Sequence, residues 1–184
     1  TGALIENLYV ETSKSLIRDY VKVSYPSLDA LSEDLSKVQI EANIKKSHID
    51  MSDLRFLAPD LEKEESMKPL LAQKFYIDGR VHGFVNDLYI PNFEFKTLDN
   101  THMLAKAHIK GLPDVEKLYV DLDLRKFTTG RRDIERLVAK SMLPDSIQLP
   151  NSISLTGKFK GGMTAFATNM NLITEQGNAS VDGN

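Results

Sequence analysis

Strict alternation of apolar and polar residues marks the segment Leu118–Arg125, which reads LYVDLDLR. Leucine or valine stands at every even position, and tyrosine, aspartate or arginine stands at every odd one. Successive side chains of a strand point to opposite faces, so the segment predicts a strand with one apolar and one polar face. One-sided strands are typical of antiparallel sheets, because parallel sheets covered on both faces have continuous apolar runs.

The same alternation recurs in other parts of the chain, at Val38–Lys45, Met103–Ile109 and Ile153–Phe159. Helical spacing is rarer. It predicts short helices near residues 28–35 and 53–57 and a longer one at 131–143, whereas the charged segment 58–74, with its two prolines, predicts a loop. The tail after Gly177 is small and polar. We therefore expect a mainly β fold, a curled antiparallel sheet or trough resembling a β-taco solenoid, with one or two short helices. A closed barrel that holds one small ligand is the alternative fold.

An internal repeat relates the two halves of the chain. The segment Ile40–Ser47, followed by Asp53, is similar to Val120–Phe127, followed by Asp133, at an offset of 80 residues. A second pair of similar segments contains Gly79 and Gly157, at an offset of 78.

A third, partial copy opens the chain, because residues 2–10 are similar to residues 83–90. The predicted organisation is the tail of a preceding repeat at 1–37, a repeat unit at 38–114 and a second, truncated unit at 115–184. We expect the chain to be a segment of a longer protein built from such units.

Composition argues against several classes of protein. The 184 residues include 23 basic and 26 acidic side chains, a net charge of −3, so there is no basic surplus to neutralise phosphates and we expect no nucleic-acid partner. No run of eighteen apolar residues predicts a transmembrane helix. Cysteine is absent, which excludes disulfides, thiolate metal sites and cysteine nucleophiles.

Candidate catalytic and metal-binding residues have plain structural interpretations. The chain has four histidines, His48, His82, His102 and His108. His82, His102 and His108 alternate with apolar residues, so we expect them on a solvated strand face rather than around a metal. Asp121 and Asp123 share a face but so do Tyr119 and Arg125, which is typical of an ordinary polar surface. We therefore expect no catalytic residue, no metal and no cofactor.

Two further motifs have structural readings as well. Asp53 and Asp133 precede apolar residues at matching repeat positions. We expect each to lie at the start of a helix, where the positive end of the helix dipole stabilises an acidic side chain. The G-x-x-x-G pairs Gly79/Gly83 and Gly157/Gly161 lack the lysine and serine or threonine of a phosphate loop, and glycines within strands indicate bends, bulges or close backbone approach.

The order of these elements resembles the repeats of the AsmA/TamB-like cell-envelope family. The residues that carry the resemblance extend over nearly the whole chain: Tyr76–Gly83, Leu88, Phe93, Thr97, Gly111–Asp114, Leu122–Thr129, Asp133, Ile134, Leu149, Pro150 and Ile153–Gly161. The resemblance implies a middle piece of a periplasmic β-trough, in a parent protein anchored in the inner membrane. Membrane contact would then come only through other parts of that parent.

The implied function is non-enzymatic: the trough would shield or conduct phospholipid acyl chains between the inner and outer membranes, or aid outer-membrane biogenesis. The implied partners are phospholipid or another acyl-chain lipid, and outer-membrane assembly proteins. The residues expected to line the groove are Ile40, Ile44, Met103, Ile109, Val120, Leu122, Leu124, Leu155 and Phe159. Two alternatives stand beside this hypothesis: an ordinary closed core, and a scaffold that captures client strands by β-augmentation.

Overall fold

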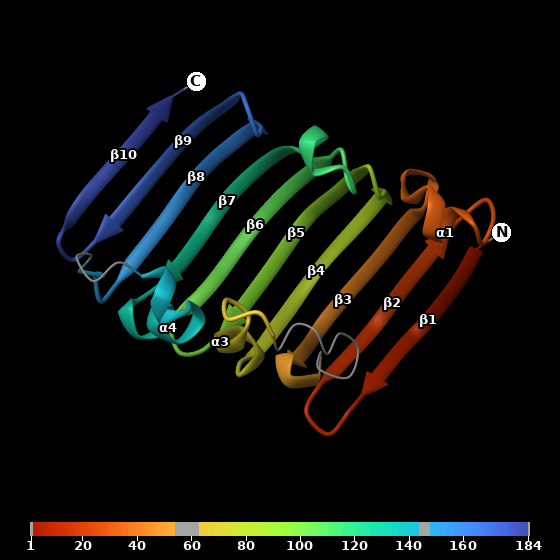
Figure 1. Ribbon diagram of the computed structural model, residues 1–184, viewed down its shortest axis with the longest axis horizontal. Helices are drawn as coiled ribbons and strands as arrows, with labels where there is room; N and C mark the ends of the chain where they lie inside the picture. Colours follow the sequence, from red (N-terminus) through yellow and green to blue (C-terminus); the bar gives the residue numbers. More distant parts are fainter. Residues whose placement is uncertain (1, 54–62, 144–147, 184) are drawn as a thin grey trace.

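A computed structural model describes residues 2–53, 63–143 and 148–183, which form one open antiparallel sheet (Figure 1). All ten strands follow each other in the sheet in chain order. This arrangement confirms the predicted mainly β, antiparallel fold. The strands are β1 Gly2–Glu11, β2 Leu16–Ser24, β3 Gln39–Asp50, β4 Lys74–Phe84, β5 Asp87–Thr97, β6 Thr101–Lys110, β7 Tyr119–Thr129, β8 Ile153–Gly162, β9 Phe166–Thr174 and β10 Gly177–Gly183.

Short helices occupy the longer connections between strands. They are α1 Ala30–Glu33, η1 Leu35–Lys37, η2 Met51–Asp53, α3 Lys68–Leu71, η4 Val115–Lys117, α4 Arg131–Leu137 and η5 Lys140–Met142. α1 and η1 confirm the helix expected near residues 28–35. Of the helix expected at 53–57, only Asp53 lies within the described residues, at the end of η2.

Two expectations about single elements were wrong, and a third segment carried no prediction. The helix at 131–143 is interrupted after Leu137, because Val138 has an extended backbone (φ −110°, ψ 135°). α3 lies inside the segment expected to be a loop, with Pro69 in its first turn, where a missing N–H costs nothing. The small, polar tail, for which no element was predicted, forms strand β10, which the two-residue turn after Thr174 folds back onto β9.

Connection lengths repeat with a period of four strands. The connections β1–β2, β4–β5, β5–β6, β8–β9 and β9–β10 are tight turns, whereas β2–β3, β3–β4, β6–β7 and β7–β8 carry the helices and longer loops. β2, β6 and β10 therefore occupy equivalent places, as do β3 and β7. Residues 38–114 contain β3–β6 and residues 115–184 contain β7–β10. These boundaries stay a prediction.

Alternate strands of the sheet carry an extra residue in mid-strand. The register shifts by one residue on β1, β3, β5 and β7 relative to the following strand, and on β3 the bulge includes Lys46, whose φ is 45°. Gly79 lies opposite Ile44 and Gly157 opposite Leu124, just before the shift in each repeat. The glycines thus accompany bulges, which bend a strand and increase its twist.

The buried core is small, and most of its residues lie where the helices and turns meet the strand ends. α3 and α4 lie side by side at one end of the sheet (Figure 1) and contact each other. Leu71 of α3, Asp133 of α4 and Thr97 at the end of β5 are each at most 1 % exposed. Elsewhere most strand residues are half-buried, because no second layer of the described residues packs on the sheet.

Candidate functional site

One face of the sheet is apolar across many strands, as strand register shows. Residues paired across neighbouring strands share a face. We call this surface the apolar face. Its main rows are Ile40, Gly83, Leu88, Ile109, Val120 and Gly161; Ile44, Gly79, Phe93, Ala105, Leu124 and Gly157; Ala107, Leu122 and Phe159; and Ile77, Phe95, Met103, Phe127 and Leu155.

The apolar face holds all nine residues that the sequence suggested as groove lining. Only Leu124 among them is buried, at 6 % exposure, and the other eight are half-buried. An ordinary closed core would have buried most of them. The face is therefore open to its surroundings, while contact with lipid stays a prediction.

No ionisable side chain interrupts this face in the rows that pair from β3 to β10. Its polar members are hydroxyls, and its aromatic members are phenylalanines. Phe75 and Phe95 meet edge to face with ring centroids 5.1 Å apart, and Phe159 stacks on Phe166 at 5.4 Å. Such a surface can solvate hydrocarbon but offers nothing to neutralise a charged headgroup.

A row of threonines ends the apolar face beside α4. Thr101 and Thr129 are buried, and their hydroxyl oxygens are 2.9 Å apart. The Thr101 hydroxyl and the Asn100 N–H each donate to Oδ2 of Asp133 at 2.8 Å. Asp133 is fully buried, and its Oδ1 has no hydrogen-bond partner in the part of the chain that the structure describes.

Asp133 lies in the first turn of α4, as its sequence position suggested. Sequence reasoning missed a second role of Asp53 and Asp133, which is to accept hydrogen bonds from a turn that is distant in sequence. Asp53 binds the β1–β2 turn through the hydroxyls of Thr12 and Ser15, as Asp133 binds the β5–β6 turn. Hydrogen bonds from Ser15 and then Thr12 hold the pKa of Asp53 below its usual value.

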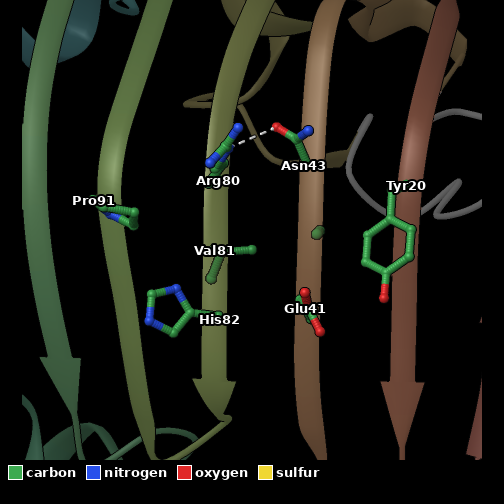
Figure 2. A pocket seen from close by; sticks show the side chains of 8 residues that line it. Tyr20, Glu41, Asn43, Arg80, Val81, His82 and Pro91 are labelled. Atoms are coloured by element: carbon green, nitrogen blue, oxygen red, sulfur yellow. Dashed lines mark hydrogen bonds between the residues drawn. The ribbon is translucent and has the colours of Figure 1, made fainter.

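The opposite face is polar and carries a shallow hollow of about 460 Å³ (Figure 2). Its lining includes Tyr20, Glu41, Arg80, His82 and Pro91. Groups of both signs are mixed there, and no orphaned buried polar atom is aimed into the hollow among the described residues. The lining gives no sign of a selective ligand.

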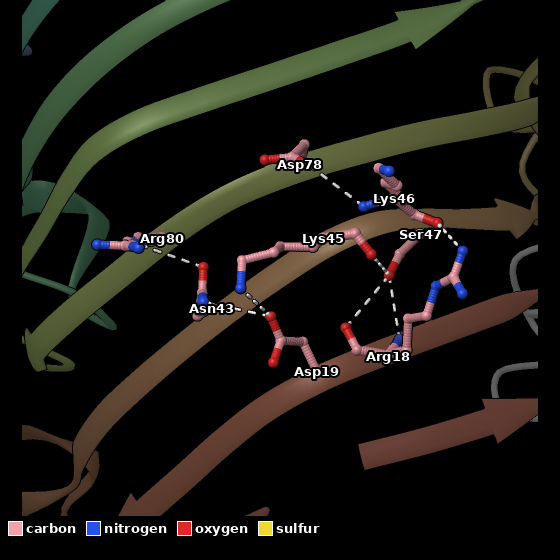
Figure 3. A network of polar contacts seen from close by, with 8 residues as sticks. All are labelled: Arg18, Asp19, Asn43, Lys45, Lys46, Ser47, Asp78 and Arg80. Atoms are coloured by element: carbon pink, nitrogen blue, oxygen red, sulfur yellow. Dashed lines mark hydrogen bonds and ion pairs between the residues drawn. The ribbon is translucent and has the colours of Figure 1, made fainter. Parts of the chain in front are cut away.

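A network of polar contacts extends from this hollow across β2, β3 and β4 (Figure 3). Arg80 donates to Oδ1 of Asn43 at 3.2 Å, and Asn43 donates to Asp19 at 3.2 Å. Lys45 pairs with the same Asp19 at 2.8 Å. Ser47, 98 % buried, accepts the Arg18 N–H at 3.1 Å beside the bulge. These contacts hold neighbouring strands in register.

All four histidines lie on the polar face, as alternation predicted for His82, His102 and His108. The Tyr89 ring stacks between His108, at 3.8 Å, and His82, at 5.6 Å. His102 contacts Glu94 at 2.9 Å, and His48 packs against Tyr76. The Lys96 ammonium, and then His102, lower the pKa of Glu94. Within the described ranges, no three histidine, aspartate or glutamate side chains converge as metal ligands.

Asp121 and Asp123 each pair with a cationic side chain and do not form a carboxylate pair that shares a proton. Asp121 lies 3.3 Å from Lys160, which raises the pKa of that lysine, and Asp123 lies 3.8 Å from Arg125. The two carboxylates therefore belong to the polar surface that the sequence predicted.

The fold and the site define a class of protein, namely one built on an open antiparallel sheet that is apolar on one face and repeats in four-strand units. Comparison with protein-family models, curated proteins and solved structures gives no significant match to this chain. In the described part of the chain, no helix is long and apolar enough to cross a membrane.

Proposed function

We propose that this chain is a non-enzymatic segment of a cell-envelope trough that shields or conducts phospholipid acyl chains. The observation that carries the proposal is the open apolar face, which extends over many strands without an ionisable side chain. Leaving it in water is unfavourable, since each buried square ångström of apolar surface stabilises by roughly 25 cal/mol.

An acyl chain fits this face better than a whole lipid does. Each CH₂ that leaves water contributes about 0.8 kcal/mol, and a uniform apolar surface lets the chain slide with little change in free energy. The phosphate would remain outside, because Leu88, Ile109 and their neighbours offer it no cation. The resemblance to AsmA/TamB-like repeats supports the periplasm as the location, with a parent protein anchored in the inner membrane.

The test is photocrosslinking at adjacent residues on opposite faces. Benzoylphenylalanine replaces either Leu122, on the apolar face, or Asp121, on the polar face, and the folded protein is irradiated with phosphatidylethanolamine–phosphatidylglycerol vesicles. We expect phospholipid adducts at position 122 and few at 121, detected by mass spectrometry. Circular dichroism checks that both variants remain folded.

Two results would contradict the proposal. Equal adducts at both positions would mean non-specific adsorption to vesicles. Only intramolecular or protein–protein crosslinks at position 122 would mean that protein covers the apolar face, as in a closed core.

A further inference from the structure

Along the strands, the apolar face has two ends, and these ends differ in charge. At the end away from α3 and α4 lie the β2–β3 and β6–β7 connections, in which acids outnumber lysines (Figure 1). Both lysines of these connections are paired, Lys37 with Asp34 at 3.0 Å and Lys117 with Asp114 at 2.8 Å. These connections therefore offer no unpaired cation to an anion beside the face.

The end beside α4 carries cations that are free to bind an anion. Arg132, Arg136 and Lys140 are exposed, and none of them forms an ion pair within the described residues. The two arginines are four residues apart in α4, so they lie on one face of the helix. The exposed acids nearby are Glu135 of α4 and Asp99 of the β5–β6 turn. Along α4 and η5, cations therefore outnumber exposed acids.

The position of α4 brings its arginines close to the apolar face. Asp133 holds the helix on the last row of that face, where its carboxylate accepts from the buried Thr101 hydroxyl at 2.8 Å. Arg136 is held as well: its carbonyl accepts from the side chain of the buried Gln73 at 3.4 Å, and its guanidinium donates to the same side chain at 3.5 Å. Phe127, two residues or about 7 Å before the end of β7, belongs to the nearest row that is apolar from β4 to β8.

We propose that Arg132 and Arg136 bind the phosphate of a phospholipid whose acyl chain lies on the apolar face. This inference rests on the proposed function, because it needs an acyl chain at that face. The rows from β3 to β10 contain no ionisable side chain, so the phosphate has to lie beside the face rather than on it. A guanidinium suits this ligand, because its planar fork donates two parallel hydrogen bonds to phosphate oxygens. The site would orient the lipid, with its headgroup at α4.

The test compares two lipids that have the same acyl chain and different headgroups. Benzoylphenylalanine replaces Phe127 to report the acyl chain. The folded protein is irradiated with palmitoyl lysophosphatidylglycerol or with uncharged monopalmitoylglycerol, each in the same nonionic detergent, and adducts are quantified by mass spectrometry. We expect Arg132→Gln/Arg136→Gln to lower the lysophosphatidylglycerol adduct at least about fivefold, because two charge-assisted contacts are lost. The monopalmitoylglycerol adduct should not change.

Two further variants separate headgroup binding from other effects. Lys106→Gln/Lys158→Gln is the matched control: it removes the same charge from exposed lysines of the polar face, which lie opposite Asp123 on neighbouring strands, and it should change neither adduct. Arg132→Gln alone keeps the contact between Arg136 and Gln73, so α4 stays in place. It should still lower the lysophosphatidylglycerol adduct.

Each contrary result has its own meaning. Undiminished lysophosphatidylglycerol adducts in both arginine variants would overturn the headgroup site and leave the acyl-chain proposal standing. An equal fall of both lipids, or an equal fall in the lysine control, would overturn it in favour of a structural effect or of non-specific attraction. No adduct with either lipid in the protein that keeps both arginines would overturn the proposed function and this inference with it.

Discussion

Gly157 is a residue whose lack of a side chain allows two strands to lie side by side. A Cβ there would come within 2.1 Å of the Asn169 carbonyl oxygen, and its φ of +147° is a conformation that L side chains rarely adopt. Gly79, its counterpart in the preceding repeat, would meet the Asn92 carbonyl oxygen at 2.9 Å. Close approach of backbones is thus the reason for glycine at both positions.

We expect Gly157→Ala to lower the free energy of unfolding by about 2–3 kcal/mol, because backbone strain and a backbone clash add. Gly183→Ala is the control, since a Cβ there meets nothing within 4 Å, and it should change stability by less than about 0.5 kcal/mol. Urea unfolding measures both. Equal effects would show that the approach of β8 to β9 relaxes easily.

At the scale of elements, acids that follow β3 and β7 bind the turns of the preceding hairpins. Asp133 joins α4 to the β5–β6 turn through Asn100 and Thr101, and Asp53 makes the equivalent contact with Thr12 and Ser15. Only the Asp133 contact is fully buried. The helical connections therefore fix the ends of hairpins that are not adjacent to them in sequence.

We expect Asp133→Ala to destabilise the protein by about 3 kcal/mol, because it leaves the Asn100 N–H and the buried Thr101 hydroxyl without their acceptor. Asp133→Asn keeps one acceptor oxygen and should cost less than half as much. Thermal unfolding of the two variants checks the ranking. A loss of stability in Asp133→Asn as large as that in Asp133→Ala would show that the negative charge of Asp133, rather than its acceptor oxygen, stabilises the turn.

At the scale of the whole molecule, the single layer makes stability uneven across the sheet. The central strands have partners on both sides, whereas β10 has one described partner and is exposed over nearly its whole length. Local opening needs least free energy where few apolar contacts must be broken.

We therefore expect amide hydrogen exchange to be slowest in β4–β7 and at least about tenfold faster in β10. Hydrogen-exchange mass spectrometry of the intact chain measures this directly. Uniform protection from β4 to β10 would contradict the expectation and indicate that the sheet opens only as a whole.

Several features of the fold could be read from local patterns. Alternation in LYVDLDLR assigned Leu122 and Asp121 to opposite faces, and the nine expected lining residues do share one face. Other features could not. β10 has too few apolar residues for a strand signal, and α3 follows a charged segment. Both depend on neighbours: β10 forms because β9 supplies its hydrogen-bond partners.

By itself the sequence determined which residues lie on each face, because side-chain direction alternates with the backbone of any strand. Only the tertiary structure decided that the apolar face is open, that Asp53 and Asp133 bind distant turns, and that the tail after Gly177 pairs with β9 as a strand. Those properties depend on which segments lie beside and above one another. Alternation along a single strand is the same whether a second layer covers the sheet or not.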